Sequence, residues 1–220
     1  LALKKKIVAD VEAVTPEHCI FASNTSAIPL AAIAEGARRP QNIIGMHYFS
    51  PVPSMPLLEI IPHTGTSDTA IATAFEVGSK QGKTCIIVKD VPGFYVNRCL
   101  GPYLSEVSAL VRDGTKLEDL DSAIKNFGMP VGPVTLADEV GIDVTSHVAN
   151  FLSAADMGVR MEGGDVSLLS NMIKKGWLGK KSGQGFYTYG KSNKKTVSSE
   201  VRAYVKEFAT RDLKLDETEI

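Results

Sequence analysis

Short apolar runs of strand length alternate with helical patterns through the first ninety residues. Apolar runs occupy 19–23, 42–49, 57–62 and 83–89, and helix signals mark 1–15, 29–36 and 66–82. Strands that alternate with helices at this spacing are typical of an α/β layer with a mainly parallel sheet. We therefore expect an α/β fold here, and four strands with an incomplete start indicate the later half of a doubly wound sheet.

The pattern changes near residues 90–92, where strand-like runs give way to long helical patterns. Helical spacing covers 94–114, 116–128, 135–155, 167–176 and 198–213. Gly141 is expected to break the third of these, and the aromatic segment 185–190 is expected to be extended. The sequence therefore predicts an α/β domain over 1–91, followed by an all-α domain over 92–220.

Charge and cysteine spacing exclude several classes of function. The formal net charge is −1, so nothing attracts a polyanion, and we expect no nucleic-acid partner. No apolar stretch approaches the roughly 20 residues that a membrane-spanning helix needs. Cys19, Cys85 and Cys99 lack the spacing of zinc ligands. We therefore expect no metal site.

Two neighbouring apolar runs each carry one titratable residue, His47 in NIIGMHYF and Glu59 in LLEII. Two strands joined by a short Pro-rich turn can bring these side chains together. A carboxylate beside an imidazole fixes the ring tautomer and stabilises the imidazolium, which suits a general base acting on a hydroxyl. A core histidine–glutamate pair without chemistry is the commoner arrangement, so the spacing alone does not decide between them.

Three further segments carry candidate binding groups. Polar side chains at 23–26 follow an apolar run, where ligands of open α/β sheets bind, although a helix N-cap needs only one of them. Pro92 and Gly93 start a helix that has Asn97 in its first turns, where Asn97 is either a donor to a substrate oxygen or a solvent-facing or capping residue. The turn GKKSGQGFY is either a phosphate or ribose contact or a solvated basic turn.

Six motifs occur in a fixed order along nearly the whole chain: ASNTSAIP, IGMHYFSPV, MPLLEII, VKDVPGFYVNR, PVGPVTLADEVGID and GKKSGQGFY. This series resembles the 3-hydroxyacyl-CoA dehydrogenase family. The spellings HYFSP and MPLLEII are most similar to its multifunctional branch, which includes the mitochondrial trifunctional enzyme alpha subunit. The resemblance implies a Rossmann-like NAD-binding domain followed by a helical C-terminal domain through which members dimerise.

The resemblance also implies roles for individual residues. His47 matches the family's catalytic histidine, Glu59 its acidic partner, and Asn97 the active-site asparagine of PGFxxNR. Ser26 matches a serine that hydrogen-bonds the substrate hydroxyl and lies near the nicotinamide.

Three further matches concern the cofactor NAD. Lys4 and Lys181 match lysines that contact NAD in the family. Ser50 stands where single-function members carry asparagine in HFFNP. Serine is usual there in the multifunctional branch, so the departure puts one cofactor contact in doubt and leaves the family resemblance intact.

The implied reaction is the oxidation of an L-3-hydroxyacyl-CoA to the 3-ketoacyl-CoA in fatty-acid β-oxidation, with NAD as hydride acceptor. The implied partners are a second copy of the chain, bound through the helical domain, and a thiolase subunit in the full-length parent. The implied compartment is the mitochondrion, with the peroxisome as the alternative.

One feature of the family is missing from the sequence: no GxGxxG precedes Lys4. We therefore expect a fragment of a longer enzyme that binds NAD weakly and turns over little by itself. Two other interpretations stay open. One is a non-catalytic, structural member of the same superfamily, and the other is a different β-hydroxyacid dehydrogenase, in which a lysine replaces the histidine–glutamate pair.

Overall fold

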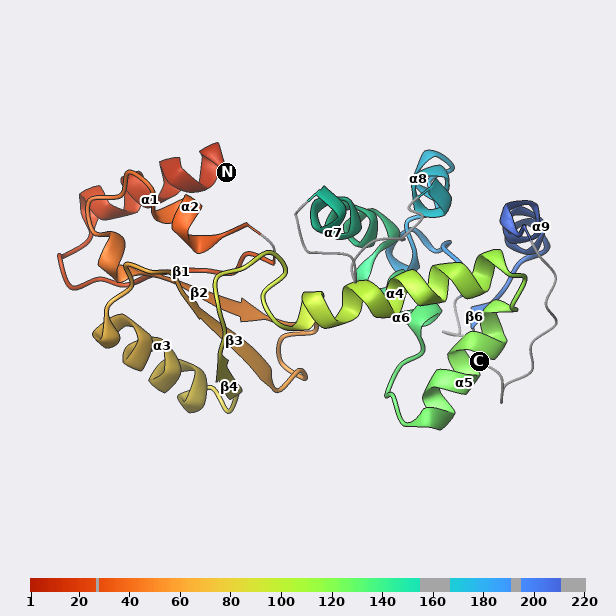
Figure 1. Ribbon diagram of the computed structural model, residues 1–220, viewed down its shortest axis with the longest axis horizontal. Helices are drawn as coiled ribbons and strands as arrows, with labels where there is room; N and C mark the ends of the chain where they lie inside the picture. The colour runs from red at the N-terminus through yellow and green to blue at the C-terminus, as the bar shows by residue number, and fades with distance from the viewer. Residues whose placement is uncertain (27, 155–166, 191–194, 211–220) are drawn as a thin grey trace. The chain divides into compact units, whose positions relative to one another are not determined.

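The α/β pattern and the helical pattern of the sequence correspond to two units in the computed structural model. The structure describes residues 1–26, 28–154, 167–190 and 195–210. The units are Leu1–Cys99 and Leu100–Ile220, and they divide inside helix α4 (Val96–Arg112). The boundary expected near residue 91 falls in the loop before this helix (Figure 1). Within the described part of the chain, no helix has the length and apolar character to span a membrane.

The first unit contains a four-stranded mixed sheet. Its strands, in sheet order, are β1 (Phe21–Ser23), β2 (Ile43–Tyr48), β3 (Leu57–Pro62) and β4 (Thr84–Ile87). β1 pairs with β2 and β3 with β4 in parallel, but β2 and β3 are antiparallel. The sheet is less parallel than expected because only residues 49–56 join β2 to β3. A parallel crossover needs a dozen or more residues, whereas a hairpin does not.

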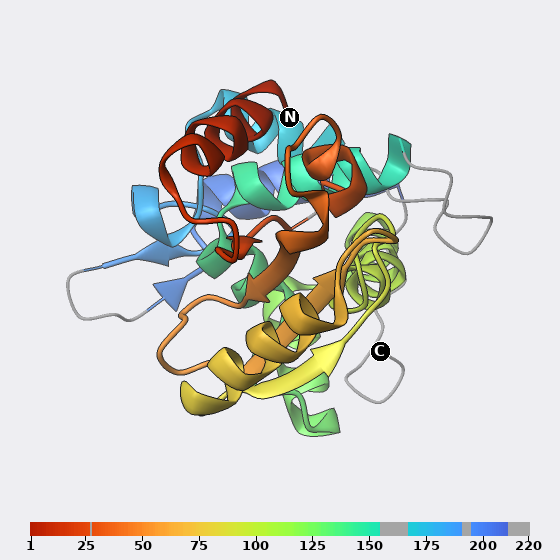
Figure 2. The same ribbon diagram turned by 90° about the vertical axis from the view of Figure 1, so that its left-hand side faces the viewer.

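Helices cover the two faces of this sheet, as Figure 2 shows. They are α1 (Ala2–Val14), α2 (Leu30–Ala34) and α3 (Asp68–Lys80), with a 3-10 turn, η1 (Pro40–Asn42), before β2. Ile43 and Ile61 pack with α1 and α2, whereas Ile44 and Ile60 pack with α3. Side chains alternate along a strand, so His47 lies on the same face as Ile43, toward α1 and α2.

Two carboxylates tie the segments around α1 and α2 to one another. Asp90 accepts hydrogen bonds of 2.8 Å from the backbone N–H groups of Leu30 and Ala31 at the start of α2. A helix of this length is not stable by itself, so the cap supplied by a distant residue helps to fix it. Glu12 accepts from the backbone N–H groups of Arg38 and Arg39, both at 2.8 Å, and thereby holds the end of α1 to the segment before β2.

The second unit is mainly helical, as expected. After α4 its elements are α5 (Leu117–Phe127), α6 (Pro133–Val140), α7 (Ile142–Ala154), α8 (Ser167–Lys174), η3 (Lys180–Ser182), β5 (Thr188–Tyr189), β6 (Lys195–Thr196) and α9 (Ser199–Phe208). Gly141, with φ of 103°, separates α6 from α7 at the expected break. Residue 155 of the third helical pattern and residues 211–213 of the last lie outside the described residues.

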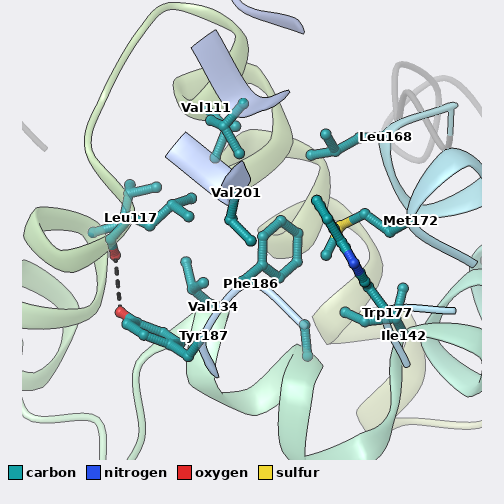
Figure 3. Close-up of a cluster of buried hydrophobic side chains, with 13 residues drawn as sticks. Val111, Leu117, Val134, Ile142, Leu168, Met172, Trp177, Phe186, Tyr187 and Val201 are labelled. Atoms are coloured by element: carbon teal, nitrogen blue, oxygen red, sulfur yellow. Dashed lines mark hydrogen bonds between the residues drawn. The ribbon is translucent and has the colours of Figure 1, made fainter. Parts of the chain in front are cut away.

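The core of this unit joins residues of helices α4 to α9 to the aromatic segment 185–190 (Figure 3). Phe186 and Trp177 lie among Leu120, Met172 and Val201, all of them buried. The expected extended segment is therefore a core element. Its side chains fill the space between helices that are far apart in the sequence.

Two buried aspartates fix that segment to the helices. Asp121 on α5 accepts from the backbone N–H of Val134 at 2.9 Å and from the hydroxyl of Tyr187 at 2.9 Å. Asp138 on α6 accepts from the backbone N–H groups of Phe186 and Tyr187, both at 2.8 Å, and from the hydroxyl of Tyr189 at 3.0 Å. Burial, with the nearby carboxylates, raises the pKa of both tyrosine hydroxyls, so both remain protonated donors.

This network explains why glycine occupies position 185. A Cβ on Gly185 would overlap the Asp138 carboxylate and the backbone of Gly179. Gly190, five residues later, is exposed and has open space around its Cα. We expect Gly185→Ala to lower the free energy of unfolding by about 1–3 kcal/mol, the usual cost of overpacking a core.

Chemical denaturation of both variants would measure this cost. Gly190→Ala is the matched control and should stay within about 0.5 kcal/mol of the parent. Equal stability of the two variants would show that the contact between the 185–190 segment and Asp138 is not tightly packed.

Candidate active site

His47 and Glu59 lie directly opposite each other on β2 and β3. The antiparallel register pairs the two residues, and His47 Nδ1 lies 2.6 Å from Glu59 Oε2. His47 is 6% exposed and Glu59 is fully buried. The short hairpin connection produces this juxtaposition, because opposite residues of an antiparallel pair project to the same face. The structure therefore brings together the two residues on which the sequence analysis depended.

The second oxygen of Glu59 binds the start of α4. Glu59 Oε1 accepts hydrogen bonds from the backbone N–H groups of Tyr95, at 3.0 Å, and Val96, at 2.9 Å. These are among the first N–H groups of the helix, which have no partner within it. The positive end of the helix dipole also favours a negative charge at this position. Glu59 thus satisfies the helix N-terminus and contacts the imidazole with one carboxylate.

This arrangement assigns the tautomer of His47. Because Glu59 Oε2 is an acceptor, Nδ1 carries the proton and Nε2 is left with a free lone pair. Among the described residues, Nε2 of His47 has no hydrogen-bond partner. It is also not among the buried side-chain atoms that lack a partner, so it is accessible from outside. It is therefore open to a ligand. The rings of Phe49 and Phe94, with centroids 4.5 and 5.8 Å from that of His47, surround the imidazole with apolar surface.

The polar loop after β1 lies beside the end of β2. Asn24 Oδ1 accepts from the backbone N–H of Tyr48 at 3.0 Å, which ties the loop to the residue after His47. Ser26 is exposed, and its carbonyl oxygen accepts from Asn97 Nδ2 at 3.0 Å. Because β1 and β2 are parallel, this loop and His47 lie at the same edge of the sheet. Ser26 and Asn97, predicted from separate motifs, are therefore in contact.

The other two polar residues of this loop have structural partners. Thr25 is buried, and its hydroxyl accepts from the backbone N–H of Ile28 at 3.1 Å, a local bond of the kind that caps turns. Ser23 is buried within β1. The expected helix N-cap is not formed by this loop, because the first N–H groups of α2 donate to Asp90. Ser26 is the exposed hydroxyl of the loop.

The three expected cofactor contacts outside this loop lie on different segments of the chain. Ser50 is exposed after β2 and precedes a cis peptide bond to Pro51. Lys4 is half-buried on α1. Lys181 lies in the second unit, where its Nζ is 2.5 Å from Asp143 Oδ1. The roles in NAD binding expected for Ser50, Lys4 and Lys181 stay predictions.

The first unit has open cavities on its surface, and His47 does not line the two described below. One, of about 410 Å³, is bordered by Asn24, Tyr48 and Lys83 and lies next to the loop just described. The other, of about 560 Å³, is bordered by His18, Arg39 and Ser67. Within the described ranges, no group of His, Cys, Asp and Glu residues is arranged to hold a metal ion.

Phe94 and the backbone N–H groups of Tyr95 and Val96 also belong to this site, and they were not predicted from the sequence. Phe94 has φ of 49° and follows Gly93, whose φ is 74°. The dipeptide Pro92-Gly93 signalled a turn, but the conformation of the aromatic residue after it has no marker in the sequence.

Comparisons with known proteins identify the family of the chain. Residues 1–91 match the model of the 3-hydroxyacyl-CoA dehydrogenase NAD binding domain, and residues 93–189 match that of the C-terminal domain of the same family. The cofactor indicated by the first match is NAD. The two matches together also agree with a Rossmann-like sheet followed by a helical domain.

Curated relatives include the fatty acid oxidation complex subunit alpha of Vibrio cholerae, 49% identical over the whole chain and 30% of that protein. The subunit of the same name from Idiomarina loihiensis is 52% identical over 88% of the chain and 27% of its own length. The chain thus spans about 30% of the relatives that it matches. These relatives are bacterial, and bacteria contain neither mitochondria nor peroxisomes. The expected mitochondrial localisation is therefore wrong.

Solved structures of related enzymes have the same fold. M. tuberculosis FadB2 is 37% identical with a TM-score of 0.80, covering 86% of this chain and 67% of that one. The (S)-3-hydroxybutyryl-CoA dehydrogenase PaaH1 of Ralstonia eutropha is 36% identical with a TM-score of 0.79, covering 87% and 68%. The dehydrogenase part of multifunctional enzyme 1 of C. elegans is 30% identical with a TM-score of 0.65, covering 99% and 49%. By sequence and by fold, the chain belongs to the 3-hydroxyacyl-CoA dehydrogenase family.

Proposed function

We propose that this chain carries the catalytic base of an NAD-dependent L-3-hydroxyacyl-CoA dehydrogenase that acts in fatty-acid β-oxidation. One observation supports this most directly: a buried imidazole is bound at Nδ1 by the Glu59 carboxylate and open at Nε2. A ring held in this way accepts a proton at one defined nitrogen. The reaction needs such a base, because loss of hydride from C3 is accompanied by loss of the hydroxyl proton.

His47 takes the proton of the substrate hydroxyl at Nε2. The imidazolium formed then lies 2.6 Å from the Glu59 carboxylate, which stabilises its charge in a site with little exposure to water. Phe49 and Phe94 exclude solvent from the ring. Ser26 and Asn97 orient the hydroxyl and thioester oxygens, which raises the fraction of bound substrate in a reactive position.

The described residues fit the reactive end of NAD, because an open imidazole nitrogen and the exposed Ser26 lie at the same sheet edge. NAD, when bound, supplies the hydride acceptor. We propose that Ser26, Ser50, Lys4 and Lys181 contribute contacts to it. The sequence carries no glycine-rich loop of the kind that binds the pyrophosphate. The 220 residues alone should therefore bind NAD weakly and turn over little.

A non-catalytic protein would also need Glu59, because Glu59 satisfies the first N–H groups of α4. It would not need an imidazole on β2 with one nitrogen left open. His47 is therefore the residue that distinguishes a catalytic from a structural role.

The test compares this chain with a chimaera in which it replaces the matching 220 residues of the Vibrio cholerae subunit. NAD reduction is followed with an L-3-hydroxyacyl-CoA. We expect turnover in the chimaera and little in the isolated chain. In the chimaera, His47→Gln should lower kcat by a factor of at least about 100 with a small change in KM, since general-base catalysis supplies a rate factor of this order.

His18→Gln is the matched control, because His18 is an exposed histidine of the same unit. We expect its kcat to stay within about twofold of the parent, as for most exposed substitutions. A folded His47→Gln chimaera with full activity would rule out the proposed base. Full activity of the isolated chain would show that the account of cofactor binding is wrong.

We also propose that the helical unit forms a homodimer and that a thiolase is a further partner of the complete protein. Exposed apolar side chains of the helical unit support the homodimer: Phe127 is 86% and Met129 42% exposed.

The thiolase partner is compatible with the names of the relatives, which are subunits of a complex. Gel filtration of the chimaera mixed with a thiolase would test this partner: we expect the two proteins to elute together, and separate elution would contradict the proposal.

Sedimentation analysis would test the homodimer. We expect Phe127→Ser to weaken self-association by about tenfold or more, because exposed aromatic residues often dominate interfaces. Phe75→Ser, at a 41% exposed phenylalanine of the first unit, should leave it unchanged. A monomeric parent, or equal effects of both substitutions, would contradict the homodimer.

A further inference from the structure

The backbone of Phe94 has a conformation that side chains rarely adopt. Its φ is 49°, and within the described ranges it is the one non-glycine residue with a positive φ. Bulky residues avoid this region because Cβ crowds the backbone. Such a conformation persists only where the surrounding structure imposes it, and it often occurs at functional sites.

The ring of Phe94 supplies that constraint. It is 2% exposed and belongs to the core cluster formed by Val8, Ile33, Ile43 and Ile61. Its backbone N–H also donates to the carbonyl of Val91 at 2.9 Å, which closes the turn. The energy gained by burying an aromatic ring opposes the cost of the unfavourable φ.

The turn at Phe94 directs the next two N–H groups toward the catalytic pair. Tyr95 and Val96 donate to Glu59 Oε1, while Glu59 Oε2 contacts His47. The ring of Phe94 also contacts the imidazole, with centroids 5.8 Å apart and planes inclined by 60°. Phe94 therefore acts on both residues of the pair: on Glu59 through the two N–H groups that follow it in the turn, and on His47 through its ring.

We propose that Phe94 is a positioning residue, whose anchored, left-handed turn holds Glu59 between the amides of α4 and the Nδ1–H of His47. The inference rests on the proposed function of His47 and adds a residue that fixes its tautomer. With the turn released, the amides leave Glu59, the carboxylate becomes free to rotate, and the imidazole no longer carries its proton at Nδ1 alone.

Two measurements on the 220-residue chain test this without substrate or cofactor. Amide hydrogen exchange reports the bonds of Tyr95 and Val96 to Glu59, and nitrogen NMR of labelled histidine reports which ring nitrogen of His47 is protonated. In Phe94→Ala we expect both amides to exchange about tenfold faster or more, because local opening becomes easier. We also expect a mixture of His47 tautomers in place of the Nδ1–H form.

Phe49→Ala is the matched control, because Phe49 also packs on His47 but is not part of the turn. It should keep the exchange rates and the Nδ1–H tautomer. If Phe94→Ala does not fold, Phe94→Leu takes its place. Leucine keeps much of the apolar bulk of the ring. We therefore expect the amides of Tyr95 and Val96 to exchange about threefold faster than in the parent, a smaller increase than in Phe94→Ala.

Unchanged exchange and an unchanged tautomer in a folded Phe94 variant would overturn the proposal. If Phe49→Ala accelerates amide exchange and mixes the His47 tautomers as much as Phe94→Ala does, the proposal is also overturned, because the effect would then follow from removing any ring beside His47. Since neither readout depends on turnover, an inactive chimaera would argue against the proposed reaction without affecting this result.

Discussion

Carboxylates that each accept two backbone N–H groups stabilise each of the two units from within. In the described part of the chain they include the buried Glu12, Glu59, Asp121 and Asp138 and the half-buried Asp90. Removing a carboxylate from water is costly unless its oxygens are hydrogen-bonded. An N–H pair at a helix start or a turn supplies both donors and favours the negative charge. Each carboxylate thus joins segments that are distant in the sequence.

The proposed catalytic pair, His47 and Glu59, has the same kind of carboxylate with one additional contact. Glu59 binds its two N–H groups through one oxygen, so the other oxygen remains for the imidazole. The helix start that fixes the carboxylate also orients the imidazole of His47. The proposed binding residue Ser26 is tied to the same helix, because Asn97 donates to its carbonyl. Strand register, hairpin length and helix position therefore all determine the geometry around His47.

The sequence predicted most of the elements, because strand-length apolar runs and helical periodicity depend on local spacing. It also brought His47 and Glu59 together, because the Pro-rich turn between their strands is short. The partners of the buried carboxylates could not be predicted, since they are backbone groups far away in the sequence. Asp121 and Asp138 gave a partial signal, because each lies on the apolar face of its helix beside buried residues. The turn at Phe94 gave none, since an aromatic residue is rare at positive φ.

The kcat of the chimaera with Glu59→Gln tests the central claim most directly. Glutamine can keep the acceptor for the α4 amides, but its NH₂ group would face Nδ1 and favour the opposite tautomer of His47. The account predicts a fall in kcat of at least about 100-fold with a small change in KM, as when a carboxylate that orients a catalytic histidine is replaced by its amide. A folded variant with kcat within about twofold of the parent would contradict the claim that Glu59 sets the tautomer of the catalytic base.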